Sequence, residues 1–172
     1  MFRSALALCA LLVTSFASSA ASAAPLVATP PATANALIVF PLSLTKLQDL
    51  DFGQMTVTTA GTVVIDPNAN TIGKTGGVLL VGTGWHAAQF VGSSAGQSSV
   101  VNIKLPNQPT TLTRQGGTET MTVTNLTLEG LSKRTVAAAQ SFTFRVGGTL
   151  NVAANQVEGI YTGTFNVDIQ YP

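Results

Sequence analysis

The residue types that most often carry chemistry are sparse in this sequence. His86 is the single histidine, and it follows the single tryptophan, Trp85, in the glycine-rich stretch 82–87. A metal site needs several convergent ligands, and a nucleophilic site needs a base oriented by a third group. One histidine in a turn supplies neither set. The sequence therefore predicts a packing or loop role for His86, or, together with Trp85, a weak candidate for a ligand-binding loop.

The acidic residues do not point to a catalytic pair either. They are spread along the chain as Asp49, Asp51, Asp66, Glu119, Glu129, Glu158 and Asp168. A glycosidase needs two acids that face each other across a cleft, and nothing in this spacing selects two. Partial matches to nucleotide-binding loops at 73–75 and 82–87 lack the strand, loop and helix order that such loops require. We predict no catalytic residue, no metal site and no cofactor, and hence a protein that is not an enzyme.

The first residues have the pattern of a secretory signal. Arg3 precedes the apolar run 5–13, and the small residues 21–23 form a cleavage site. The apolar run is too short to span a bilayer, so we expect no transmembrane segment in the mature chain. Residues 1–23 are therefore interpreted as a signal peptide, and the protein is expected to be secreted through the periplasm to the cell surface or the extracellular space.

Cleavage after Ala23 also changes the charge and the redox chemistry. It removes Cys9, the single cysteine, which leaves neither a disulfide nor a thiolate. It removes Arg3 as well, so seven of the eight basic residues remain against seven acidic residues. A neutral chain carries no electrostatic signature of nucleic-acid binding. Net charge near zero favours contacts between molecules, which an assembling protein tolerates.

The remaining chain is predicted to form one all-β domain. Short β-rich runs recur between glycine, proline and asparagine turns, a spacing typical of a sandwich or barrel. The last run is the clearest, because polar residues separate its apolar members and place them on one face. These members are Phe165, Val167, Ile169 and Tyr171. Helix formers follow one another only over residues 136–140, which predicts a turn or a single helical turn.

An unusual apolar segment precedes the domain. Residues 24–35 are rich in Ala, Pro and Thr and are interpreted as a flexible leader. Residues 36–44 are densely apolar, and the whole of 36–172 is assigned to one β-sandwich domain. Three interpretations of 36–44 stay open. In the first it is the first strand of its own domain, and in the second it is a strand donated to a neighbour. A shared use is the third, with the first half donated and residues 42–47 paired at home. The candidate donor residues are Leu37, Ile38, Val39, Phe40 and Leu42.

Four stretches together resemble a known family across nearly the whole mature chain. They are Leu50-Asp51-Phe52-Gly53, Gly61 to Ile65, Phe144 to Leu150 and Gly159 to Tyr171. This order resembles the bacterial domain-of-unknown-function family numbered 4402. It is more distantly similar to spore coat protein U and the archaic chaperone-usher pilins. The pilin resemblance implies an incomplete immunoglobulin-like β-sandwich that the N-terminal extension of the next subunit completes. The chain departs from those pilins in having no cysteine near its first strand.

Two functions of different classes follow from these observations. The first is a non-enzymatic structural subunit of a pilus-like cell-surface filament that assembles by β-strand addition. For it, the resemblance implies homotypic or related subunits, a periplasmic chaperone and an outer-membrane usher as partners. The alternative is a monomeric secreted β-sandwich that binds a carbohydrate or protein ligand through loops around Trp85 and His86.

Overall fold

A computed structural model describes residues 33–38 and 41–172. The predicted signal peptide 1–23, most of the leader, Val39 and Phe40 lie outside the described residues. The chain divides into two units, Met1–Leu37 and Ile38–Pro172. In the first unit the described residues 33–37 form no strand and are exposed, and Ile38, the first residue of the second unit, is also exposed.

The second unit is built from strands joined by turns, and no helix occurs among the described residues. The prediction of an all-β fold is confirmed. The strands, in chain order, are β1 (Leu42–Gln48), β2 (Gln54–Val57), β3 (Gly61–Asp66), β4 (Thr71–Lys74), β5 (Val78–Val81), β6 (Ala88–Ser94), β7 (Ser99–Lys104), β8 (Thr110–Arg114), β9 (Thr120–Leu128), β10 (Lys133–Val136), β11 (Ser141–Val152), β12 (Tyr161–Thr162) and β13 (Asp168–Gln170).

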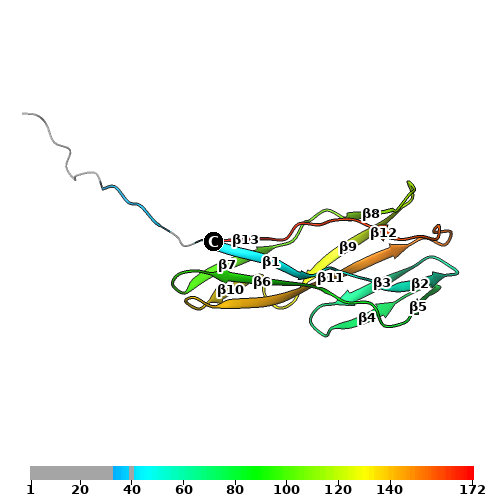
Figure 1. The fold of residues 1–172 in the computed structure, drawn as a ribbon, viewed down its shortest axis with the longest axis horizontal. Coiled ribbons are helices and arrows are strands. Elements are labelled where there is room, and N and C mark those ends of the chain that lie inside the picture. Colours follow the sequence, from blue (N-terminus) through cyan, green and yellow to red (C-terminus); the bar gives the residue numbers. More distant parts are fainter. Residues whose placement is uncertain (1–32, 39–40) are drawn as a thin grey trace, which may run out of the picture. The chain divides into compact units, whose positions relative to one another are not determined.

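The strands form two layers of antiparallel sheet (Figure 1). One layer is an eight-stranded sheet with the path β1-β6-β11-β9-β8-β12, to which β3 and β4 are attached through β11. The other layer consists of two smaller sheets, β10-β7-β13 and β2-β5. Strands β7 and β13 cover one half of the large sheet, and β2-β5 covers the other half. This arrangement is a β-sandwich, in which each layer buries one face against the other.

The core follows this division of the second layer. Beneath β2-β5, a first cluster is centred on Val63, Ile65 and Val78. Beneath β7 and β13, a second cluster contains Phe90 and Phe144, whose rings stack with centroids 5.4 Å apart. Phe144 is 0% exposed. Both clusters draw their residues from alternate positions of the strands, which is the pattern that a pleated strand with one buried face produces.

Strand β11 holds the large sheet together, because it pairs with β6, β9 and β3 along its length. The sequence predicts a strand only over 142–146. In the structure the strand continues through Gly147 and Gly148 to Val152. A Cβ on Gly147 would lie 2.1 Å from the carbonyl oxygen of Ile65. Glycine is therefore needed here for the close approach of β3, and does not end the strand.

The C-terminal segment crosses from one layer to the other. It leaves β8 at β12, runs extended through residues 163–167 and joins β7 as β13. The hydroxyl of Tyr161 donates to the carbonyl oxygen of Val157 at 2.6 Å and accepts a hydrogen bond from Nε2 of Gln156 at 2.7 Å. This contact has the form of the tyrosine corner of immunoglobulin-like sandwiches. It fixes the direction in which the last segment leaves the preceding loop.

Most strands that the sequence predicts are present, but four were missed. These are β4, β8, β10 and β12, which are short or lie beside polar turns. Residues 137–140 form a turn, as predicted, with Ala139 in the left-handed region at φ 53°. The last apolar run alternates as predicted, although only residues 168–170 of it are paired in a sheet.

The two glycines on either side of β3 give a matched test of this packing. Gly147→Ala should destabilise the protein by about 2 kcal/mol or more, because the methyl group collides with backbone of β3. Gly73→Ala in β4 is the control, since its Cβ would meet nothing within 4 Å. That change should be neutral or stabilise by up to about 1 kcal/mol. Urea unfolding of both variants measures the difference, and equal costs would show that the close approach is misassigned.

Candidate functional site

Two sheet edges lie next to each other where the chain begins and ends its domain. Strand β1 is paired only with β6, at the end of the large sheet, and β13 is paired only with β7, at the end of the small sheet. In Figure 1 the C-terminal segment ends beside β1. Within the described part of the chain, no strand covers the outer edge of either one. An edge strand presents unpaired N–H and C=O groups, which can accept a further strand.

The side chains between these edges are apolar and incompletely covered. Leu44 of β1 and Phe165, Val167 and Ile169 of the C-terminal segment all pack against the second core cluster. Each remains half-buried, whereas the residues beneath them are fully buried. We call these four residues the apolar seam. Asn166, Asp168 and Gln170 between them are exposed, so the row points inward, as the alternation predicts.

The candidate donor residues fall on both sides of the start of β1. Leu37 and Ile38 are 87% and 93% exposed and belong to no strand. Val39 and Phe40 lie outside the described residues. Leu42 is the first residue of β1 and pairs with Ser94 of β6. Residues 42–46 pair with β6, as the shared interpretation of this segment expects, whereas Leu47 has no partner on β6. Leu42 therefore belongs to the home strand.

Trp85 and His86 are half-buried and built into the fold. Trp85 packs against the first core cluster. His86 exchanges two backbone hydrogen bonds with Asp51, of 2.9 and 2.8 Å, and its ring Nδ1 lies 2.9 Å from the carbonyl oxygen of Asp49. The Oδ1 of Asp51 accepts from the N–H of Gly53 at 2.7 Å, and Gly53 has φ 74°. The stretch Leu50 to Gly53 is therefore a turn that buries Phe52 and positions the histidine.

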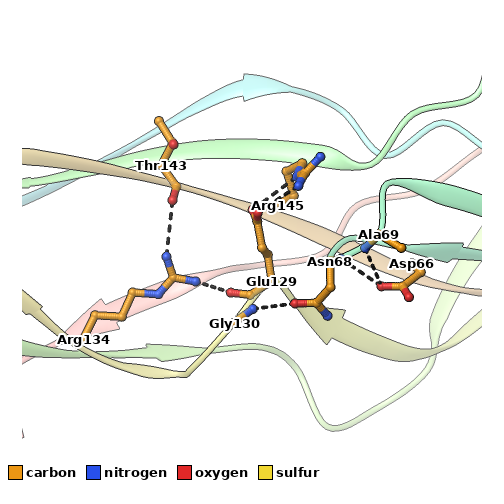
Figure 2. A network of polar contacts seen from close by, with 8 residues as sticks. All are labelled: Asp66, Asn68, Ala69, Glu129, Gly130, Arg134, Thr143 and Arg145. Atoms are coloured by element: carbon orange, nitrogen blue, oxygen red, sulfur yellow. Dashed lines mark hydrogen bonds and ion pairs between the residues drawn. The ribbon is translucent and has the colours of Figure 1, made fainter.

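A polar network surrounds Glu129, at the end of β9 (Figure 2). Its Oε1 accepts from Arg145 Nη2 at 2.8 Å, and its Oε2 accepts from the backbone N–H and Nε of Arg145 at 2.9 and 3.2 Å. Its backbone carbonyl accepts from Arg134, which also donates to the carbonyl oxygen of Thr143 at 3.3 Å. The carboxylate of Glu129 is therefore saturated by a single arginine, in a fork that fits its two oxygens.

The same network ties the β3–β4 turn to the loop after β9. Asn68 Oδ1 accepts from the N–H of Gly130 at 2.8 Å, and Asp66 Oδ1 accepts from the N–H of Asn68 at 2.8 Å. Both contacts are drawn in Figure 2. Asp66 thus stabilises the β3–β4 turn through its local backbone amides. Asn68 links two loops that are far apart in the sequence.

These contacts shift the titration of the charged pair. Hydrogen bonds from Arg145 hold the pKa of Glu129 below its usual range, against an opposing effect of burial. The same hydrogen bonds raise the pKa of Arg145 above its ordinary value. At the other end of β9, the hydrogen bond from Arg114 likewise lowers the pKa of Glu119. Both carboxylates are therefore held in the ionised form.

A cleft of about 400 Å³ opens beside this pair. Its polar lining comes from Gln48 at the end of β1, Asn70 in the β3–β4 turn, His86, Gln89 of β6, Glu129 and Arg145. Of these, the sequence singles out only His86 as a candidate for ligand binding. The others come together through strand register and through one turn, and no short motif in the sequence could have marked them.

Four other acidic residues are each engaged singly. Asp49 pairs with Lys46, Glu119 pairs with Arg114, and Asp66 and Asp51 accept from turn amides.

Among the described residues, no group of three or more metal-ligating side chains is assembled. The part of the chain that the structure describes also contains no helix long and apolar enough to cross a membrane.

Taken together, these features define a class: an all-β sandwich of immunoglobulin-like type with two adjacent sheet edges and a polar cleft. The chain belongs to the family described as a domain of unknown function (DUF4402), whose model matches residues 42–171. The match begins with the first residue of β1 and includes β13, so it covers the sandwich and leaves out the apolar residues before it. No curated protein and no solved structure matches the chain.

The Glu129–Arg145 pair predicts a specific pH dependence. Because the pKa of Glu129 is lower in the folded protein than in the unfolded chain, the pair stabilises the fold above about pH 4.3, the ordinary glutamate value. This contribution is lost as the pH falls through the folded-state pKa. Glu129→Gln should therefore lower the free energy of unfolding at neutral pH, and its difference from the wild type should shrink in acid.

Urea unfolding between pH 7 and about pH 2 measures this difference. Glu158→Gln is the matched control, because Glu158 is exposed in the loop after β11 and forms no ion pair among the described residues. Its difference from the wild type should stay small and flat. A Glu129→Gln difference that does not change with pH would contradict the assignment.

Proposed function

We propose that this protein is a non-enzymatic structural subunit of a cell-surface filament, exported through the periplasm and assembled by β-strand addition. The donated strand is the apolar segment ahead of β1, and the acceptor is the pair of edges formed by β1 and β13 in a second subunit. A periplasmic chaperone and an outer-membrane usher would be the partners that deliver it, as the resemblance to archaic chaperone-usher pilins implies. The observation that carries the proposal is an exposed apolar segment that comes directly before β1 in the sequence, where β1 and β13 are two neighbouring edge strands.

The donor segment is exposed and apolar, so binding to a partner would bury side chains that now contact solvent. Leu37 and Ile38 hold large apolar side chains almost entirely in solvent. Burying one such side chain is worth about 1.5–3 kcal/mol. The segment 36–40 has no charged residue, and its β-branched residues favour a strand. Its transfer from solvent into a neighbouring sandwich would therefore be favourable.

The acceptor has the two properties that strand addition needs. The outer edges of β1 and β13 offer backbone donors and acceptors for main-chain hydrogen bonds. The apolar seam of Leu44, Phe165, Val167 and Ile169 offers half-covered side chains for contact. In strand addition, the backbone bonds supply affinity and the side-chain contacts supply register. A neutral surface adds no repulsion between subunits.

The connection between donor and acceptor supports polymer formation. Only residues 39–41 separate the exposed Ile38 from β1, which is paired at home. Each subunit would therefore carry its donor directly on the strand that forms one wall of its own acceptor. Such a head-to-tail contact is heterologous, and repeated contacts of this kind build an open filament.

Moving the donor segment within one chain tests this proposal. The mature protein lacking residues 24–40 should need an added strand to be stable. Without one, it should self-associate or melt at low temperature because its apolar seam stays uncovered. A second copy of residues 34–44, attached after Pro172 through a flexible Gly/Ser linker, should restore a stable monomer. A tethered strand acts at about millimolar effective concentration.

The matched control carries the same attached segment with Ile38→Asp and Phe40→Asp, which removes two apolar contacts while keeping length and linker. It should melt like the truncation. Melting temperature and sedimentation velocity are the measurements. A truncated protein that is already a stable monomer, or an attached segment that gives no gain over its control, would reject strand addition and favour the monomeric binding module.

A further inference from the structure

We propose that the polar cleft beside Glu129 binds a neutral polyhydroxylated ligand, that is, a carbohydrate. This site goes beyond filament assembly, because it uses neither the β1 nor the β13 edge for strand pairing. Its volume of about 400 Å³ lies within the range of small-molecule sites in proteins, which is about 300–1,000 Å³. A cleft of this size accommodates one or two sugar rings.

Strand register places three planar polar side chains in one row across the cleft. Gln48 of β1 is the register partner of Gln89 of β6, and Gln89 is the register partner of Arg145 of β11. Residues directly opposite each other project from the same face, with neighbouring strands about 4.8 Å apart. The row therefore offers hydrogen-bonding groups at regular intervals on the outward face of the large sheet.

An irregularity in β1 produces this row. The register shifts between Lys46 and Gln48, so Leu47 is left without a partner on β6. Without the shift, Leu47 would stand opposite Gln89 and an apolar side chain would enter the row. Bulges commonly turn a side chain toward a site in this way. Here the shift brings the amide of Gln48 to the cleft, and Leu47 is left exposed outside the cleft lining.

The side-chain amides of this site are available to a ligand. No hydrogen bond joins the side chains of Gln48, Gln89 or Asn70 to another group in the described part of the chain. Each amide has a carbonyl oxygen that accepts and an NH₂ group that donates. A sugar hydroxyl also both donates and accepts. The two sets of groups are therefore complementary without any charge.

His86 adds an acceptor whose orientation is fixed by the fold. Its Nδ1 lies 2.9 Å from the carbonyl oxygen of Asp49, and a carbonyl only accepts. An N–H at Nδ1 donates to this oxygen, and in the neutral imidazole the lone pair of Nε2 is then available to a ligand donor. The bridge between Asp51 and His86 holds the ring at the edge of the cleft.

The charges of the cleft select against an ionic ligand. Arg145 occupies both carboxylate oxygens of Glu129, so the single anion and the single cation of the lining cancel each other. A bound anion would have to compete with Glu129 for Arg145, and a bound cation would have to compete with Arg145 for Glu129. A neutral ligand can hydrogen-bond to the remaining N–H and oxygen positions while the pair stays intact.

Saturation-transfer difference NMR on the full mature protein tests this site, because it observes the ligand and works at any state of assembly. The probes are glucose, galactose, mannose and N-acetylglucosamine as neutral sugars, and glucuronic acid as a charged one. At millimolar concentration, at least one neutral sugar should receive transfer, and glucuronic acid should receive less than its neutral counterpart glucose.

Two variants assign the transfer to the cleft. Gln89→Ala removes the central amide of the row and should weaken binding about tenfold, the effect of one lost hydrogen bond in a bound complex. Thr143→Trp fills the cleft from an exposed position of β11 and should abolish transfer. Gln115→Ala, an exposed glutamine in the β8–β9 turn, is the control and should change nothing.

Circular-dichroism melting confirms that each variant is folded. No transfer to any neutral sugar, transfer that survives Thr143→Trp, or stronger transfer to glucuronic acid than to glucose would each overturn the proposal. None of these outcomes bears on strand addition, which depends on the outer edges of β1 and β13 and is tested by melting temperature and molecular mass.

Discussion

A β-strand satisfies its backbone hydrogen bonds only when it is paired on both sides, and this constraint governs the whole architecture. Strand β11 pairs with three strands, β6, β9 and β3, and so forms the centre of the large sheet. Strands β1 and β13 are paired on one side only. The chain thus places its best-paired strand at the core and leaves the two strands nearest its termini with edges toward solvent. Edges of this kind are open to pairing with a further strand unless something covers them.

Polar contacts organise the regions that pairing does not reach. The Glu129–Arg145 pair, with Asn68 and Gly130, joins the β3–β4 turn to the end of β9 and sets one wall of the cleft. The bridge between Asp51 and His86 sets another wall. The chain has few charged residues and a formal net charge of +1, so its surface is close to neutral overall. A neutral surface of this kind is suited to contacts with other subunits and with uncharged ligands.

The sequence predicts the parts of this structure that depend on local pattern. Alternation in 165–171 marks the inward row, and the apolar run before residue 42 stands out by composition. Features that depend on register could not be predicted in this way. Gly147 lies outside the strand predicted over 142–146, yet β11 continues through it because glycine allows the close approach of β3, a contact between residues far apart in the sequence. Gln48, Gln89 and Arg145 carry no motif, and they meet only because three strands align with one shift in β1.

The account depends most on whether the edges of β1 and β13 accept the apolar segment as a strand. Hydrogen–deuterium exchange of the protein lacking residues 24–40, with and without a synthetic peptide of residues 34–44 added in trans, measures this directly. The account predicts slower exchange confined to the amides of β1 and β13, while those of β11 stay unchanged because they are already paired. Protection that is absent, or that appears only at β2 and β5 at the other half of the sandwich, would contradict it.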